Sequence, residues 1–438
     1  MQLSPSAPTG VSDESVENAI ETLLAGGEID LREATARREA FARFSEMTFP
    51  AAPSARYWKR DPNAYDWSSV EIFRPVLVPG EVALPEGSPL VPDPAGYGRQ
   101  WGNLAYAAVA PRAGKRGVIV SDVRSAHREH RELIAASLGS ALERAPSKAG
   151  LLARALSRNG AFIFVPAGVV LEAPILFDHL ADGGDEFPHS LVIAGEGAQF
   201  TVVERYFGDT SRLICGLTEI VAAPRAQVRY AAVNEHGAAA TTLFTRRAIC
   251  GADARVELAI ADLGEAYISD SIVFSNDAKG GHSELAALFF TSGKQYVDLS
   301  SEVRHSAGDT TSQTVVKSAG IGRGQGRFVG NIVISANAHG ADASLRDDVL
   351  LLSKDAHIDS VPALEISAND VKAFHGATVG SIDEEELFYA QSRGLAREEA
   401  ERMIALGFFE PAIAHFPFEA ARDLVREALA VKLRGRAV

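Results

Sequence analysis

The sequence is poor in cysteine, and it has fewer basic than acidic residues. Only Cys215 and Cys250 occur among 438 residues, which excludes a disulfide framework and a four-cysteine zinc or cluster site formed by one chain. We therefore expect a reducing compartment. Lys and Arg number 43 against 57 Asp and Glu, so the net charge is −14. This charge argues against nucleic acid or an anionic membrane as a partner.

Long apolar runs are also missing. The longest, over residues 161–171, is interrupted by Pro166 and is much shorter than the ~20 residues that cross a membrane. The N-terminal residues lack a basic start followed by an apolar stretch, so we expect no secretory signal and a cytoplasmic location. Hydrophobic residues make up 46% of the chain and charged residues 23%, which is typical of a globular protein.

Several motifs of catalytic sites are absent as well. The sequence has no GxxxxGK phosphate loop and no HExxH, GxSxG or CxxC motif. The glycine-rich run over residues 320–326 lies inside a β-rich region and does not begin a helix, so we interpret it as a turn. We therefore expect no ATP site on this chain.

Residues 1–160 are expected to form a mostly helical N-terminal region. Apolar residues recur there at the spacing of one helix face. The expected elements are helices over residues 15–24, 31–44 and 129–158 (broken near Pro146), a strand over 117–123, and irregular chain over 62–98.

Residues 161–380 contain a repeat. Similar small–polar–apolar triplets begin at Ala198, Ala226 and Ala254, at steps of 28 residues, and later ones follow at steps of 29. This period leaves no room for a strand–helix–strand crossover with its turns. We therefore predict one continuous right-handed parallel β-helix over these residues, since the loops of a β-sandwich would vary in length. The later triplets begin at Ser283, Ser312, Ala341 and Asp370, and a second series lies midway at Gln295, Gly326 and Ala356.

Residues 381–438 are expected to form a C-terminal helical domain. Asp383 followed by Glu386 is typical of a capping box, and acidic residues in the first turn suit the helix dipole. A second helix is predicted over residues 395–408, ending at Gly407, and a last amphipathic helix follows. Helices at both ends would also cover the unpaired edges of the solenoid.

Histidine is the commonest candidate ligand in the repeat. His357 and His375 lie near the C-terminal end of the predicted solenoid, and either could be a metal ligand or an ordinary histidine. His305 follows a stretch of alternating residues, and we expect it to face outward.

Cys250 is the other reactive candidate. It follows Arg246 and Arg247, which would lower the pKa of its thiol if they reach it and so favour sulfur transfer or metal binding. A buried structural thiol is the alternative for Cys250 and the expectation for Cys215.

Short motifs follow one another in a distinctive order along the chain. They are Asn159–Gly168, Gly326–Gly330, Pro362–Ile366, His375–Thr378, Leu387–Tyr389, Ser392–Gly394 and Gly407–Phe408. No single motif is specific, but in this order they resemble the SufB/SufD family of iron-sulfur cluster assembly proteins. The resemblance covers residues 160–407 well and the N-terminal part thinly.

The resemblance implies a right-handed parallel β-helix between helical regions, and a scaffold rather than an enzyme. In this family a SufB-like and a SufD-like chain pair, and the pair binds a SufC-like ATPase through the C-terminal helical domains. A transient iron-sulfur cluster is implied at the shared interface. ATP chemistry would belong to the partner, in agreement with the missing phosphate loop.

The residues around His375 favour the SufD-like member of the family. The SufB-like member carries glutamate on both sides of this histidine, where this chain has Phe374 and Gly376, and a cluster-associated cysteine near the position of Ala356. The resemblance therefore implies that His375 is a cluster or iron ligand at the partner interface.

Two positions depart from the SufD-like pattern. Many SufD-like chains carry a cysteine where this chain has Ala373, and the segment ending at Cys250 resembles the sulfur-accepting segment of the SufB-like member. The resemblance thus implies Cys250 as a sulfur acceptor.

Two other functions remain open on the sequence. One is a homodimeric scaffold of the same family, which needs no SufB-like partner. The other is a polysaccharide-binding β-helix, a class that requires clustered acids in an open groove. Asp347 and Asp348 form the only acid pair late in the repeat, which argues against that class.

Overall fold

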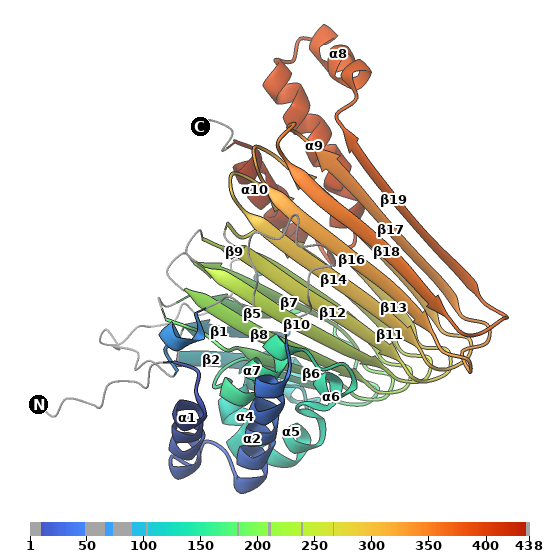
Figure 1. Ribbon diagram of the computed structural model, residues 1–438. Coiled ribbons are helices and arrows are strands. Elements are labelled where there is room, and N and C mark those ends of the chain that lie inside the picture. Colours follow the sequence, from blue (N-terminus) through green and yellow to red (C-terminus); the bar gives the residue numbers. More distant parts are fainter. Residues whose placement is uncertain are drawn as a thin grey trace, which may run out of the picture.

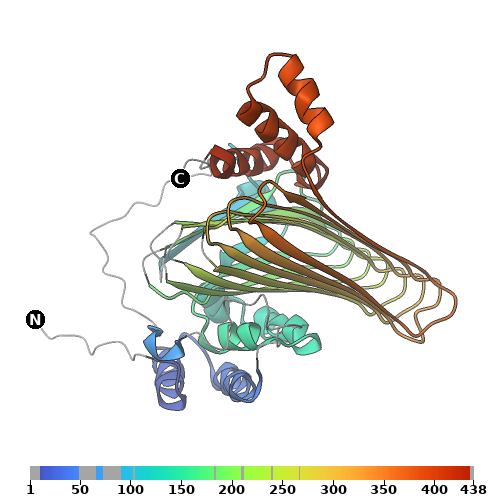
Figure 2. The same ribbon diagram turned by 45° about the horizontal axis from the view of Figure 1, so that its top comes forward.

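A computed structural model describes residues 10–48, 66–72, 90–101, 104–181, 184–208, 212–237, 240–265 and 267–434. The chain forms a parallel β-solenoid of about 7 turns with helical regions at both ends of the sequence (Figure 1). The N-terminal and C-terminal helices cover opposite outer faces of the solenoid (Figure 2). No helix of the described residues is long and apolar enough to cross a membrane.

The solenoid consists of two sheets, and strands from β4 onward alternate between them. The ten-stranded sheet contains, in spatial order, β19 (Lys372–Ser381), β17 (Asp342–Leu351), β15 (Thr311–Gly320), β13 (His282–Thr291), β11 (Arg255–Asp262), β9 (Gln227–His236), β7 (Gln199–Gly208), β5 (Ile175–Leu180), β1 (Gly96–Trp101) and β2 (Leu104–Val109). The nine-stranded sheet contains β18 (His357–Ile366), β16 (Gln325–Ile334), β14 (Tyr296–His305), β12 (Tyr267–Asn276), β10 (Thr241–Cys250), β8 (Leu213–Ala222), β6 (His189–Ala194), β4 (Ala161–Val165) and β3 (Ile119–Asp122).

Alternate residues of each strand face the solenoid interior, as a strand's period of two requires. In β16, buried and half-buried positions alternate along the whole strand. Phe328 and Ile332 stack on Leu299 and Val303 of β14, so like positions of successive turns form apolar columns. These columns make up the main core.

The predicted β-helix is confirmed. The neighbouring strands from β4 to β19 are parallel, and among the residues described no helix interrupts them. β7, β9 and β11 begin 28 residues apart, which matches the sequence period. The sheets also extend before residue 161, because β1, β2 and β3 add to them. Most of the stretch predicted as irregular, residues 62–98, lies outside the described residues.

The N-terminal helices begin where the sequence offers capping side chains. α1 (Asp13–Ala25) follows Ser12 and α2 (Leu31–Glu46) follows Asp30, and both side chains accept a backbone N–H of the first turn. Both helices pack on α7 (Lys148–Leu156), which lies against β8 and β10. The predicted helices in these regions are therefore confirmed. Shorter elements are η2 (Trp67–Ser69), α3 (Pro111–Gly114), α4 (Val123–Glu129), α5 (Arg131–Ser137) and α6 (Ser140–Arg144).

The C-terminal helices are α8 (Glu384–Ser392), α9 (Arg397–Ile413) and α10 (Glu419–Arg434). α9 packs on the outer face of the ten-stranded sheet, where Phe409 lies 6.5 Å from Phe290 of β13, centroid to centroid. α10 buries one apolar stripe in the same cluster, whereas α8 packs mainly on α9.

Two details of these helices differ from the sequence expectation. α9 continues past Gly407, because residues that follow it, such as Phe409, are buried against the sheet and outweigh the low helix propensity of glycine. Asp383 caps α8 through the backbone N–H of Glu385 and does not form a capping box with Glu386.

The two ends of the solenoid differ. At the N-terminal end, the antiparallel pairs β1–β2 and β3–β4 terminate the sheets. At the other end, β18 and β19 are the last strands of their sheets. We call β18 and β19 together the open end.

Candidate functional site at the open end of the solenoid

The open end exposes strand edges and apolar side chains. β18 and β19 each have a strand neighbour on one side only within the described part of the chain. Phe374 of β19 is 61% exposed and Val379 is 56% exposed. Unpaired edges of this length pair readily with strands of another chain. This surface therefore suits a protein partner.

His375 lies on β19 opposite Leu345 of β17, which is opposite Thr314 of β15. Leu345 is buried in the solenoid core, so His375 belongs to an interior-facing column. It is nevertheless exposed, because no further turn covers β19. No described residue is hydrogen-bonded to its ring. An exposed imidazole at an open edge is free to bind a ligand.

Asp347 is an acidic residue of the neighbouring strand β17. It lies opposite Val316 of β15 and Ala377 of β19, on the interior side of β17. Its side chain is fully buried. Burial raises the pKa of Asp347 to about 6, although the nearby hydroxyl of Ser360 opposes the rise.

The other histidines of the repeat do not belong to this arrangement. His357 lies on the outward side of β18, and its Nε2 is 2.9 Å from Asp359. His305 is buried and is hydrogen-bonded to Thr310 and Ser312, so the expectation that it faces outward is wrong. His305 is aligned with Ile334 of β16, which is buried, so His305 lies inside the solenoid.

Cys250 is the last residue of β10 and is only 1% exposed. Burial raises the pKa of its thiol to about 12. Arg246 instead binds Asp270, with 2.7 Å between Nε and the carboxylate, and Arg247 donates to the backbone oxygen of Ala145. The two arginines therefore bind other groups, and the structure fits the alternative of a buried thiol at Cys250.

The structure does not bring Cys250 and His375 together. β10 is four strands from β18 in the nine-stranded sheet, which at a spacing of ~4.8 Å is about 19 Å, and His375 lies in the other sheet. Cys215 is also buried, and its Sγ donates to the backbone oxygen of Ala149 at 3.2 Å, as expected for a structural thiol.

Both thiols should be unreactive in the folded chain. With the pKa of Cys215 and of Cys250 raised to about 12, the thiolate fraction near neutral pH is minute and reagent has no access. We expect less than one labelled thiol per folded chain after about an hour with excess maleimide near pH 7.5. In denaturant, both thiols of each chain should be labelled. A Lys294→Cys variant at an exposed turn is the control for reagent activity. Rapid native labelling of Cys250 would contradict its burial.

The solenoid interior also holds a network of ionisable groups around Glu204. The carboxylate of Glu204 accepts hydrogen bonds from Ser190 at 2.6 Å and Tyr206 at 3.0 Å, and from Tyr230. His179 lies 3.2 Å away. Burial raises the pKa of Glu204, but hydrogen bonds from His179, Ser190 and Tyr230 outweigh it and lower the pKa to about 2.

This network continues along the solenoid interior to two further acidic residues, Asp262 and Asp270. Arg246 donates to the Tyr230 hydroxyl at 3.2 Å and to Asp270 at 2.7 Å. Asp262 lies close by, and burial together with the charge of Asp270 raises its pKa to about 8. Sequence reasoning did not find this network, although the charged residues occupy interior positions of strands and could have drawn attention on that ground.

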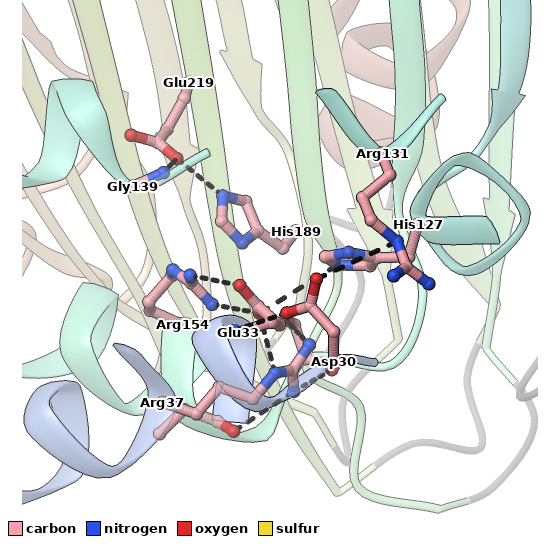
Figure 3. Close-up of polar contacts among 11 residues, drawn as sticks. Asp30, Glu33, Arg37, His127, Arg131, Gly139, Arg154, His189 and Glu219 are labelled. Carbon is pink, nitrogen blue, oxygen red and sulfur yellow. Dashed lines mark hydrogen bonds and ion pairs between the residues drawn. The ribbon is translucent and has the colours of Figure 1, made fainter. Parts of the chain in front are cut away.

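A separate buried cluster joins the N-terminal helices (Figure 3). Glu33 of α2 accepts two hydrogen bonds from Arg154 of α7, at 2.5 and 2.7 Å, and one from Arg37 at 2.8 Å. Arg37 also donates to the backbone oxygen of Ser157 at 2.5 Å. Burial lowers the pKa of His127 to about 4, so this neighbour stays neutral near pH 7. One carboxylate and two guanidinium groups therefore bind each other tightly.

Glu219 of β8 connects this helical region to the solenoid (Figure 3). Its carboxylate accepts the backbone N–H groups of Gly139, Ala141 and Leu142, at 2.6 to 2.9 Å, at the start of α6. It also lies 2.7 Å from Nε2 of His189 on β6. The geometry is that of a buried helix cap, so we assign both clusters to structure and not to catalysis.

No group of three or more potential metal-ligating side chains occurs among the described residues. The interior side of β17 and β19 near the open end supplies two such groups among the described residues, His375 and Asp347. An iron-sulfur cluster held at the open end would therefore take ligands from a second chain.

Comparison with known proteins agrees with this architecture. Residues 179–408, just over half of the chain, match the family described as "SUF system FeS cluster assembly, SufBD core domain". An iron-sulfur cluster assembly SufBD family protein of Staphylococcus epidermidis is 30% identical over 341 residues, covering 76% of this chain and 73% of that protein. Proteins of the same description from Staphylococcus haemolyticus and Staphylococcus aureus are 29% identical with the same coverage.

These matches span most of the solenoid and reach into the C-terminal helices. They favour iron-sulfur cluster assembly over the polysaccharide-binding alternative, and they include the strands of the open end. This chain belongs to the SufBD family of iron-sulfur cluster assembly proteins.

Proposed function

We propose that this chain is a non-catalytic, SufD-like scaffold subunit of a cytoplasmic SufBCD-type complex. It pairs with a SufB-like chain through the open end and binds a SufC-like ATPase through its C-terminal helices. The iron-sulfur cluster is cargo that forms at the shared interface, with His375 as the ligand from this chain. The observation that carries the proposal is an exposed histidine at the unpaired end of both sheets.

The open end supports pairing with another chain. Strand edges bordered by exposed apolar residues are costly to leave in water, and a second solenoid end would cover them by strand pairing. A SufB-like partner would also supply the thiolates that Ala356 and Ala373 do not. The alternative, a homodimer, uses the same surface but brings two identical ends together and so adds no cysteine ligand near His375.

The C-terminal helices support docking of an ATPase. Phe388 of α8 is 72% exposed, Tyr389 is 61% exposed and Met403 of α9 is 51% exposed. Aromatic residues and methionine are enriched at protein interfaces. These exposed residues are not the α9 and α10 residues that are buried against the solenoid. They can therefore be mutated without disrupting the packing of the helices on the solenoid.

The test is co-purification with co-expressed SufB-like and SufC-like chains. We expect the wild-type chain to recover both, and Phe388→Asp to lose at least about ten-fold of the ATPase while keeping the SufB-like chain. Leu31→Asp, at a residue of α2 that is 71% exposed, is the matched control and should recover both. Recovery of neither partner by the wild-type chain would overturn the proposal.

A further inference from the structure

One side chain of β19 is hydrogen-bonded within the described part of the chain, that of Thr378. Its hydroxyl donates to a carboxylate oxygen of Asp348 on β17, with 2.6 Å between the two oxygens. The two residues are directly opposite each other on the outer side of the sheet, since the next residue of β17, Val349, lies in the core. A hydrogen bond to an ionised acceptor is roughly twice as strong as one between neutral groups. Asp348 therefore holds the last strand of the ten-stranded sheet.

The same carboxylate also binds a lysine of the next strand inward. Nζ of Lys317 on β15 donates to the other oxygen of Asp348 at 2.7 Å. Arg346, whose side chain is largely exposed, donates to that oxygen at 3.0 Å. Burial raises the pKa of Asp348, but hydrogen bonds from Lys317 and Thr378 outweigh it and lower the pKa below its ordinary value. Asp348 is buried, so salt screens this ion pair less than it would an exposed one.

Lys317 connects this pair to the C-terminal helices. Its Nζ lies 4.7 Å from the ring centroid of Phe408 on α9, within the range of a cation–π contact. Phe408 in turn packs edge-on against Phe409, which is buried, with 5.3 Å between the ring centroids. A continuous series of contacts therefore runs from α9 through Lys317 and Asp348 to Thr378 at the open end.

β19 has little other support on its outer side. Gly376 and Gly380 flank Thr378 on that side, and a glycine in a strand has no side chain to pack. Phe374, at the next outward position, is exposed. β19 also has a strand neighbour on one side only within the described residues. Such a strand should open locally more easily than the inner strands, so the contact with Asp348 matters most here.

We propose that Asp348 is a positioning residue: it fastens β19 to α9 through Lys317 and keeps this strand ordered for pairing with a second chain. The pairing itself belongs to the proposed function, on which this inference rests. A strand that is ordered beforehand loses less conformational entropy when a partner strand adds to it. Loss of the Thr378 hydroxyl or of the Lys317 charge should therefore weaken pairing.

The test is hydrogen–deuterium exchange of the isolated full-length chain, measured by mass spectrometry. Thr378→Val removes the hydroxyl but keeps a β-branched side chain, and should speed exchange of the β19 amides at least about five-fold. Lys317→Met keeps a long side chain but removes the charge, and should give a similar rise because Asp348 then loses its link to α9. The amides of β7 should exchange at the wild-type rate in both variants.

Two further variants and one partner measurement make the test specific. Thr378→Ser restores a hydroxyl and should restore slow exchange in β19. Thr201→Val makes the same change at an outward position of β7, opposite the exposed Arg229, and should leave β19 unchanged. Recovery of a co-expressed SufB-like chain should fall at least about five-fold for Thr378→Val and return with Thr378→Ser.

Wild-type exchange of β19 in either Thr378→Val or Lys317→Met would overturn the inference. Faster exchange of β7 in these variants would also overturn it, because it would indicate a general loss of stability. Normal recovery of the SufB-like chain by a Thr378→Val chain with a loosened β19 would show that Asp348 does not position the strand for pairing. These outcomes are distinct from failure of the proposed function, which is overturned if the wild-type chain recovers neither partner.

Discussion

Replacing His375 by alanine is expected to reduce cluster formation by the assembled complex by at least about ten-fold. Mutation of a residue that is only hydrogen-bonded to a metal ligand already lowers metal affinity by about ten-fold or more. Removal of a direct ligand should therefore have a larger effect. Folding should be intact, because His375 is exposed and no described residue is hydrogen-bonded to its ring. The measurement is visible absorbance after anaerobic reconstitution, beside a thermal melt of the isolated chain.

The control for this variant is His357→Ala. His357 is on β18, the last strand of the other sheet, and is also partly exposed, but it faces outward. It should leave cluster yield unchanged. A normal yield for His375→Ala, or a loss that follows lowered thermal stability, would show that His375 is a structural residue.

Replacing Glu33 by alanine is expected to destabilise the chain by about 3–5 kcal/mol. Glu33 is the anion between Arg37 and Arg154, and both guanidinium groups are buried. Removing the carboxylate leaves two buried cations without their partner, and the contact between α2 and α7 should be lost first. Urea denaturation followed by circular dichroism measures the change.

The matched control is Glu17→Ala. Glu17 pairs with Arg38 on the exposed side of α1 and α2, where an ion pair contributes at most about 1 kcal/mol. Equal effects of the two variants would contradict the account of the buried cluster.

The effect of Glu33 should also depend on pH. Burial raises its pKa, but Arg154 and Arg37 outweigh this and lower the pKa well below the ordinary 4.5. A carboxyl whose pKa is lowered in the folded state stabilises above its unfolded pKa and loses that contribution as pH falls. The difference between wild type and Glu33→Ala should therefore be largest at neutral pH and shrink below about pH 4.

Much of the fold could be predicted from the sequence because each turn of a solenoid repeats the same pattern of residues. Ala198, Ala226 and Ala254 occupy corresponding turn positions just before β7, β9 and β11, so the period of the triplets is the length of one turn of chain. The ends of helices were less predictable. Gly407 stays helical because residues that follow it in α9 pack against the ten-stranded sheet. A single sequence does not show this packing.

The candidate site was only partly predictable. The sequence placed His375 near the end of the repeat, and the structure adds that it faces the interior column yet remains exposed. Cys250 shows the limit of reasoning from sequence neighbours, because Arg246 and Arg247 point to opposite sides of the strand and find other partners.

We expect cluster assembly to need this chain together with a second, SufB-like chain. The most direct measurement is the visible absorbance of an iron-sulfur cluster after anaerobic reconstitution of this chain alone, with the SufC-like ATPase, and with both partners. We expect absorbance above background only when the SufB-like chain is present. A stable cluster on this chain alone, in the absence of the SufB-like chain, would contradict it.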